Sequence, residues 1–94
     1  MGESDVRFQL RSDVVTHDID EGLLVVNLET GKTWKLNHVG AAVCRGLERG
    51  TDLAQIAAEL SERYRVAAAT VRKDVDALVE NLRQEGLVEA LPAG

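Results

Sequence analysis

Residues 23–50 read LLVVNLETGKTWKLNHVGAAVCRGLERG, and this stretch decides the fold. Two short apolar runs, 23–28 and 32–36, stand on either side of ETG, a composition that predicts a hairpin turn. The second run passes into a predicted helix without a linker. A small antiparallel sheet that leads directly into helices leaves its last strand unpaired on one side. Such an edge can accept an extended peptide as an additional strand.

The other strand assignments follow from residue type and alternation. Residues 14–19, VVTHDI, are rich in β-branched side chains and predict a preceding strand. The run LLVV is apolar on both faces, so 23–28 is expected to be the central strand. Side chains alternate along 32–36, which places Trp34 and Leu36 together on one face.

Three amphipathic helices are predicted after the strands. Asn37 is expected to cap the first helix through its side-chain oxygen, and Gly50 to end it. Thr51 or Asp52 would cap the second, and residues 69–85 form the third. Apolar residues recur three or four positions apart in each helix, which is typical of helices that pack one face on a core.

The predicted order is β-β-β-α-α-α, and strands segregated from helices indicate an α+β fold. We expect a three-stranded antiparallel sheet followed by a three-helix bundle that is winged helix-turn-helix-like. A chain of 94 residues fits one domain, assigned here to residues 13–90. Residues 1–12 are expected to form a flexible N-terminal segment and 91–94 a tail.

Composition narrows the classes of partner. The formal net charge is −5 at pH 7, which argues against general attraction to nucleic acid or anionic membranes. No apolar run approaches the ~18 residues needed to span a bilayer, and the N-terminal sequence lacks the pattern of a signal peptide. The single cysteine excludes an internal disulfide framework and is compatible with a cytoplasmic protein.

No pattern typical of catalysis is present. His17 and His38 have no companions at metal-ligand spacing, and surface or capping roles account for both. Cys44 lies within the first predicted helix beside a core position, which favours a buried, inert thiol. We therefore expect a protein that is not an enzyme and that uses no metal or other cofactor.

The helical bundle also raises a DNA-binding hypothesis, in which the third helix would enter the major groove. That helix carries more acidic than basic side chains, so it would repel phosphates. The basic residues are Arg72, Lys73 and Arg83, and the acidic ones are Asp74, Asp76, Glu80 and Glu85.

The third helix suggests a peptide groove more readily. Its apolar stripe is wide, because Val79 lies to one side of the other apolar positions. One part of the stripe could pack on the other helices while its flank faces strand 32–36, leaving a groove between that strand and helix residues 71–83. The alternative is that Val79 simply widens the contact with the core.

Several features in order resemble the PqqD-like family, named for the pyrroloquinoline-quinone biosynthesis chaperone. They begin at Thr30-Gly31, continue through Leu36-Asn37 and Gly40-Ala41, and include Tyr64-Arg65-Val66 at the end of the second helix. The third helix adds Val71-x-x-Asp74-Val75-x-x-Leu78-x-x-x-Leu82-x-x-x-Gly86-Leu87. Together the features extend over residues 14–88.

The resemblance implies a recognition element for ribosomally made, post-translationally modified peptides. Such a protein holds the leader of a precursor peptide as an added strand on its third strand, beside its third helix, and delivers it to a processing enzyme. The resemblance assigns peptide binding to the strand residues Lys32, Thr33, Trp34, Lys35 and Leu36. On the helix, we select from the helical wheel Arg72, Val75, Asp76, Val79 and Arg83.

The Thr-Gly hairpin and the Val39-Gly40-Ala41-Ala42 start of the first helix look more like the discrete recognition proteins of lasso-peptide pathways. The expected partners are then a precursor leader peptide and a leader peptidase or cyclase, with no nucleic acid and no membrane. Two alternatives stay open. One is a pyrroloquinoline-quinone-type peptide chaperone for a radical SAM enzyme, and the other is a winged-helix DNA-binding regulator.

Overall fold

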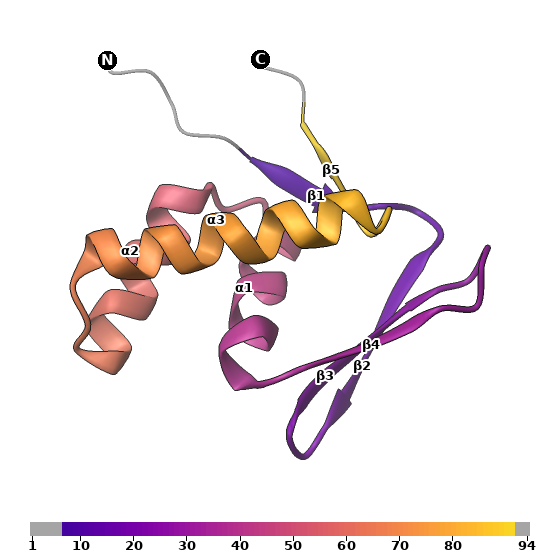
Figure 1. The fold of residues 1–94 in the computed structure, drawn as a ribbon, viewed down its shortest axis with the longest axis horizontal. Coiled ribbons are helices and arrows are strands. Elements are labelled where there is room, and N and C mark those ends of the chain that lie inside the picture. The colour runs from indigo at the N-terminus through magenta and orange to yellow at the C-terminus, as the bar shows by residue number, and fades with distance from the viewer. Residues whose placement is uncertain (1–6, 92–94) are drawn as a thin grey trace.

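A computed structural model describes residues 7–91 and has an α+β fold, as predicted (Figure 1). The predicted strands and the third helix lie within one residue of the observed bounds. In chain order the elements are β1 Phe8–Leu10, β2 Val14–Ile19, β3 Gly22–Asn27, β4 Thr33–Leu36, α1 His38–Glu48, α2 Leu53–Tyr64, α3 Ala68–Gln84 and β5 Val88–Ala90.

The main sheet has the antiparallel order β2-β3-β4, so the run predicted to be central is central. Asn27 is buried at the end of β3, and its side-chain oxygen accepts hydrogen bonds from the backbone N–H groups of Glu29 (2.8 Å) and Thr30 (3.1 Å). These bonds shape the turn into β4. At the other end of β3, Gly22 has φ 152°, and a Cβ there would lie 2.0 Å from the Leu36 carbonyl oxygen, so only glycine fits.

A second, two-stranded sheet was not predicted. β1 pairs antiparallel with β5, with Phe8 opposite Ala90 and Leu10 opposite Val88. Residues 8–10 belong to the segment expected to be flexible, and that expectation is wrong there, because Phe8 and Leu10 pack against the core. Their partner strand lies about eighty positions away, beyond the range of any local pattern. Residues 1–6 and 92–94 of the two expected end segments lie outside the described residues.

The helix caps follow the sequence prediction. The Asn37 side chain accepts a hydrogen bond from the Gly40 N–H (2.9 Å), and the Asp52 side chain accepts one from the Gln55 N–H (2.8 Å). Each bond satisfies a donor that the first turn of a helix leaves without a partner. Asn37 directly follows β4, so the cap fixes the start of α1 against the end of the strand.

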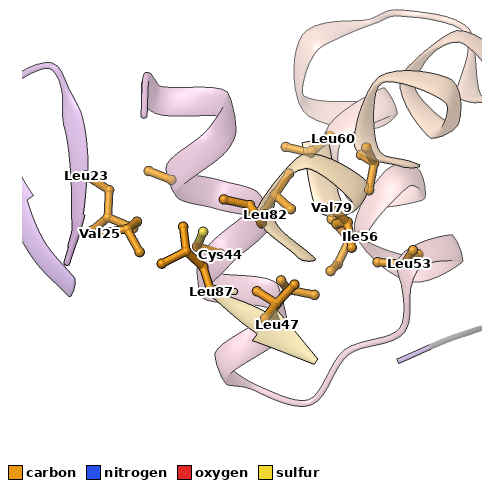
Figure 2. Close-up of a cluster of buried hydrophobic side chains, with 14 of the residues drawn as sticks. Leu23, Val25, Cys44, Leu47, Leu53, Ile56, Leu60, Val79, Leu82 and Leu87 are labelled. Atoms are coloured by element: carbon orange, nitrogen blue, oxygen red, sulfur yellow. The ribbon is translucent and has the colours of Figure 1, made fainter. Parts of the chain in front are cut away.

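The core lies between the inner face of the main sheet and the three helices. Figure 2 shows Leu23 and Val25 pointing from the sheet toward the helices, with Cys44 and Leu47 on α1 and Ile56, Val79 and Leu82 beyond them. α1 and α2 approach closely at Gly46, where a Cβ would lie 2.7 Å from the Ile56 side chain. α1 therefore connects the sheet to the other two helices.

Candidate functional site

The outer edge of β4 has no strand partner within residues 7–91. The hairpin determines which residues of β4 bond to β3 and which point outward, because the Asn27 N–H donates to the Lys32 carbonyl oxygen (2.9 Å). Because successive residues of a strand direct their N–H and C=O groups to opposite edges, Trp34 and Leu36 bond toward β3. The N–H and C=O groups of Thr33 and Lys35 therefore point away from the sheet, free to pair with another strand.

Side chains on β4 alternate as predicted. Trp34 and Leu36 are half-buried on the inner face and pack against the core, whereas Thr33 and Lys35 are exposed on the outer face. Lys32 lies in the hairpin rather than in the strand, and its N–H donates to the Thr30 hydroxyl (3.2 Å). An added strand would therefore meet backbone groups at the edge and apolar side chains on one face.

An apolar pocket of about 160 Å³ opens between the start of α1, which follows β4 after Asn37, the end of α2 and the first half of α3. We call it the interhelical pocket. Three large side chains that line it are exposed to solvent, and exposed apolar side chains that gather in one place often mark an interaction site: Val39 (41%), Tyr64 (44%) and Val66 (41%). Its lining residues are Val39, Val43, Leu60, Tyr64, Val66, Val71, Asp74, Val75 and Leu78.

The turn between α2 and α3 holds two of these side chains at the rim. Arg65 caps α2 in the left-handed conformation (φ 56°), which non-glycine residues rarely adopt. Ser61 fixes the turn twice: its hydroxyl donates to the Val66 carbonyl oxygen (2.6 Å), and its own carbonyl oxygen accepts from the Val66 N–H (3.2 Å). The strained turn places Tyr64 and Val66 beside the pocket.

On α3 the structure separates the predicted site residues. Val75 and Val79 are each only 2% exposed. Val75 lines the pocket, but Val79 does not and belongs to the buried core, as the alternative of a wider core contact expects. The side chains that reach the pocket from the flank of α3 are Asp74 and Leu78, which the sequence analysis did not select. The only hint of this in the sequence was that Leu78 lies at the other edge of the apolar stripe of α3, opposite Val79.

The predicted charged residues of α3 lie away from the pocket. Arg72 pairs with Asp76 (2.8 Å), and both line a separate shallow hollow with Ala69, Thr70 and Lys73. Arg83 pairs with Glu80 (2.6 Å), and these hydrogen bonds lower the pKa of the Glu80 carboxyl. None of these three charged residues lines the interhelical pocket.

The remaining reactive side chains form no site. Cys44 is fully buried, and burial together with the nearby charge of Glu48 raises the pKa of its thiol to about 12, so it stays protonated and unreactive at neutral pH. Within residues 7–91 no group of three or more His, Cys, Asp or Glu side chains could hold a metal ion. None of the described helices is both long and apolar enough to cross a membrane.

Comparison with solved structures shows the same fold in peptide-bound relatives. "Lasso peptide synthetase B1 complexed with the leader peptide" is 30% identical, with a TM-score of 0.81, and the match covers 92% of this chain and 99% of that one. "TbiB1 in Complex with the TbiA(beta) Leader Peptide" is 26% identical, with a TM-score of 0.83 and coverage of 90% and 99%.

A third structure is the PqqD truncation of Methylobacterium extorquens PqqCD, described as a stand-alone recognition element for ribosomally synthesized and post-translationally modified peptides. It is 25% identical, with a TM-score of 0.76 and coverage of 92% of this chain and 90% of that one. The curated proteins include no match to the sequence. Residues 22–88 match the family described as "Coenzyme PQQ synthesis protein D (PqqD)", and the chain therefore belongs to the PqqD family.

Proposed function

We propose that this protein is a leader-peptide-binding adaptor of lasso-peptide biosynthesis. It would capture a ribosomal precursor by β-strand addition and present it to a leader peptidase or cyclase. Two relatives of 30% and 26% identity, matched over nearly their whole length, carry leader peptides in their structures and support this function. The family member from pyrroloquinoline-quinone biosynthesis matches with a lower TM-score, 0.76 against 0.81 and 0.83, and that pathway is the second choice.

One observation carries the proposal: β4 has an edge without a strand partner in residues 7–91, and it runs through Asn37 into α1, whose first turn lines the apolar pocket with Val39. Hydrogen bonds to the N–H and C=O groups of Thr33 and Lys35 would bind any extended backbone, because main-chain groups carry no sequence information. The interhelical pocket would then select a side chain. Affinity and selection would thus come from different parts of one surface.

The docking strand of this proposal consists of Thr33, Trp34, Lys35 and Leu36, with Lys32 at its start, and Val75 forms part of the pocket wall. The helices and the β3–β4 hairpin would form a winged-helix-like arrangement used for a peptide rather than for DNA. The protein would be cytoplasmic, and it would itself catalyse no reaction. It would raise the local concentration of the precursor at its enzyme.

Intrinsic fluorescence tests the proposal, because Trp34 is the only tryptophan and lies half-buried on the docking strand. Titration with the leader peptide of its precursor should shift or quench the emission and saturate near one peptide per protein. We expect a Kd between micromolar and nanomolar, which corresponds to about −8 to −12 kcal/mol. A scrambled leader is the control. Calorimetric binding that leaves Trp34 emission unchanged would move the site away from β4.

A further inference from the structure

One charged residue stands among the nine that line the interhelical pocket. Asp74 reaches it from α3, while the other eight are seven aliphatic residues and Tyr64. The Asp74 side chain is exposed, so it lies at the mouth rather than in the interior. A side chain in the pocket would therefore have a carboxylate at its rim.

This carboxylate is not neutralised by a neighbour. The other acidic residues along α3 include Asp76, which pairs with Arg72 (2.8 Å), and Glu80, which pairs with Arg83 (2.6 Å). Asp74 has neither an ion pair nor a side-chain hydrogen bond with any residue of the described range 7–91. Its charge is therefore available to a ligand.

Tyr64 adds a second group that favours a cation at the same place. Its ring is 44% exposed and belongs to the same pocket as Asp74. The face of an aromatic ring attracts ammonium and guanidinium groups, and the aliphatic stem of a lysine or arginine can lie along apolar side chains such as Val39 and Val66. The rim therefore suits a long cationic side chain, and the interior suits an apolar one.

The spacing of those two side chains follows from strand geometry. In an extended peptide, residues i and i+2 point to the same side and lie ~7 Å apart. If the peptide pairs with β4 and places an apolar side chain in the pocket, the nearest side chain on that same side belongs to a residue two positions away.

We propose that the interhelical pocket recognises an apolar residue separated by one position from a lysine or arginine, with Asp74 reading the cation. This inference depends on the proposed peptide-binding function and adds the class of sequence that the site prefers. Because the pair at Asp74 would be solvent-exposed, the preference should be modest, roughly two- to five-fold in Kd, and should weaken as salt is raised.

Selection from a library of random twelve-residue peptides displayed on phage tests the proposal without knowledge of the natural precursor. The wild type should enrich peptides in which a lysine or arginine stands two positions from an aliphatic or aromatic residue. Asp74→Asn should lose the preference for the cation and keep that for the apolar residue. Asp74→Lys should favour Asp or Glu at the cationic position.

Asp76→Asn is the matched control, because Asp76 is an exposed aspartate of the same helix that lies outside the pocket. It should retain the wild-type preference. The inference would be overturned if the peptides selected by the wild-type protein showed no enrichment of lysine or arginine. It would also be overturned if Asp74→Asn and Asp76→Asn lost the preference for the cation equally. Selected peptides that bind a folded Thr33→Pro variant as well as the wild type would instead contradict strand addition, so the two failures are distinguishable.

Discussion

The two outer edges of the main sheet differ in what lies beside them. On both edges, alternate residues direct their N–H and C=O groups away from the sheet: Thr33 and Lys35 on β4, and Thr16 and Asp18 on β2. On β2 this assignment follows from the hydrogen bond between the Leu28 N–H and the Asp13 carbonyl oxygen (2.8 Å). The structure describes no strand on either edge.

Polar contacts surround the β2 edge. Thr16 donates a hydrogen bond to Glu48 (3.3 Å), and Asp18 forms an ion pair with Arg45, so α1 holds these side chains. The hollow beside the end of β2 is mixed: it includes the charged residues Asp18, Arg45 and Arg63 as well as apolar residues such as Ile19. β4 instead continues through Asn37 into the start of α1, where Val39 lines the apolar interhelical pocket. An open edge alone therefore does not define a binding site, and the neighbouring surface decides which edge a peptide would use.

Proline substitution gives the largest expected difference between the edges. Thr33→Pro removes an outward N–H from β4 without removing a bond to β3, so the fold should persist while a peptide loses a donor. We expect leader-peptide affinity to fall about ten-fold or more, since the unpaired peptide carbonyl adds a cost of ~1–3 kcal/mol. Calorimetry measures the affinity, and circular dichroism verifies folding.

Thr16→Pro is the matched control, because it replaces the same residue type at an outward position of β2. Its affinity for the leader peptide should stay within about two-fold of the wild type. If Thr16→Pro weakens binding as much as Thr33→Pro does, the assignment of the peptide to the β4 edge is wrong.

Alanine substitutions at the two edges of the apolar stripe of α3 should change leader-peptide affinity less than Thr33→Pro does. Leu78→Ala should reduce leader-peptide affinity roughly five-fold, because Leu78 lines the interhelical pocket and is half-buried, and it should cost about 1 kcal/mol of stability. Val79→Ala should cost about 2 kcal/mol, since Val79 is 2% exposed, with little effect on the affinity of the folded protein. Denaturant unfolding and calorimetry measure the two quantities. The reverse pattern would place the groove on the Val79 margin.

The sequence predicted most of the fold because the main sheet and the helices have local signals. Alternation marked β4, Asn37 and Asp52 marked the helix starts, and LLVV marked the central strand. The β1–β5 pair had no such signal, since it joins strands from opposite ends of the chain.

The strand half of the candidate site was predictable, but the helix half was not. Which margin of α3 faces the pocket depends on how the helix is rotated against α1 and α2, and a helical wheel does not contain that rotation. The helical wheel therefore favoured Val79, Arg72 and Arg83, whereas the structure places Leu78 and Asp74 at the pocket.

Amide hydrogen exchange tests strand addition most directly, because it reports on the hydrogen bonds themselves. Residue-resolved exchange is measured by NMR for the free protein and for its complex with the leader peptide. Strand addition at β4 predicts that the amides of Thr33 and Lys35 exchange fast in the free protein and become at least ten-fold slower in the complex. The outward amides of Thr16 and Asp18 on β2 should exchange at the same rate in both. Unchanged exchange at Thr33 and Lys35 in a saturated complex, or protection that appears at Thr16 and Asp18 instead, would contradict the account.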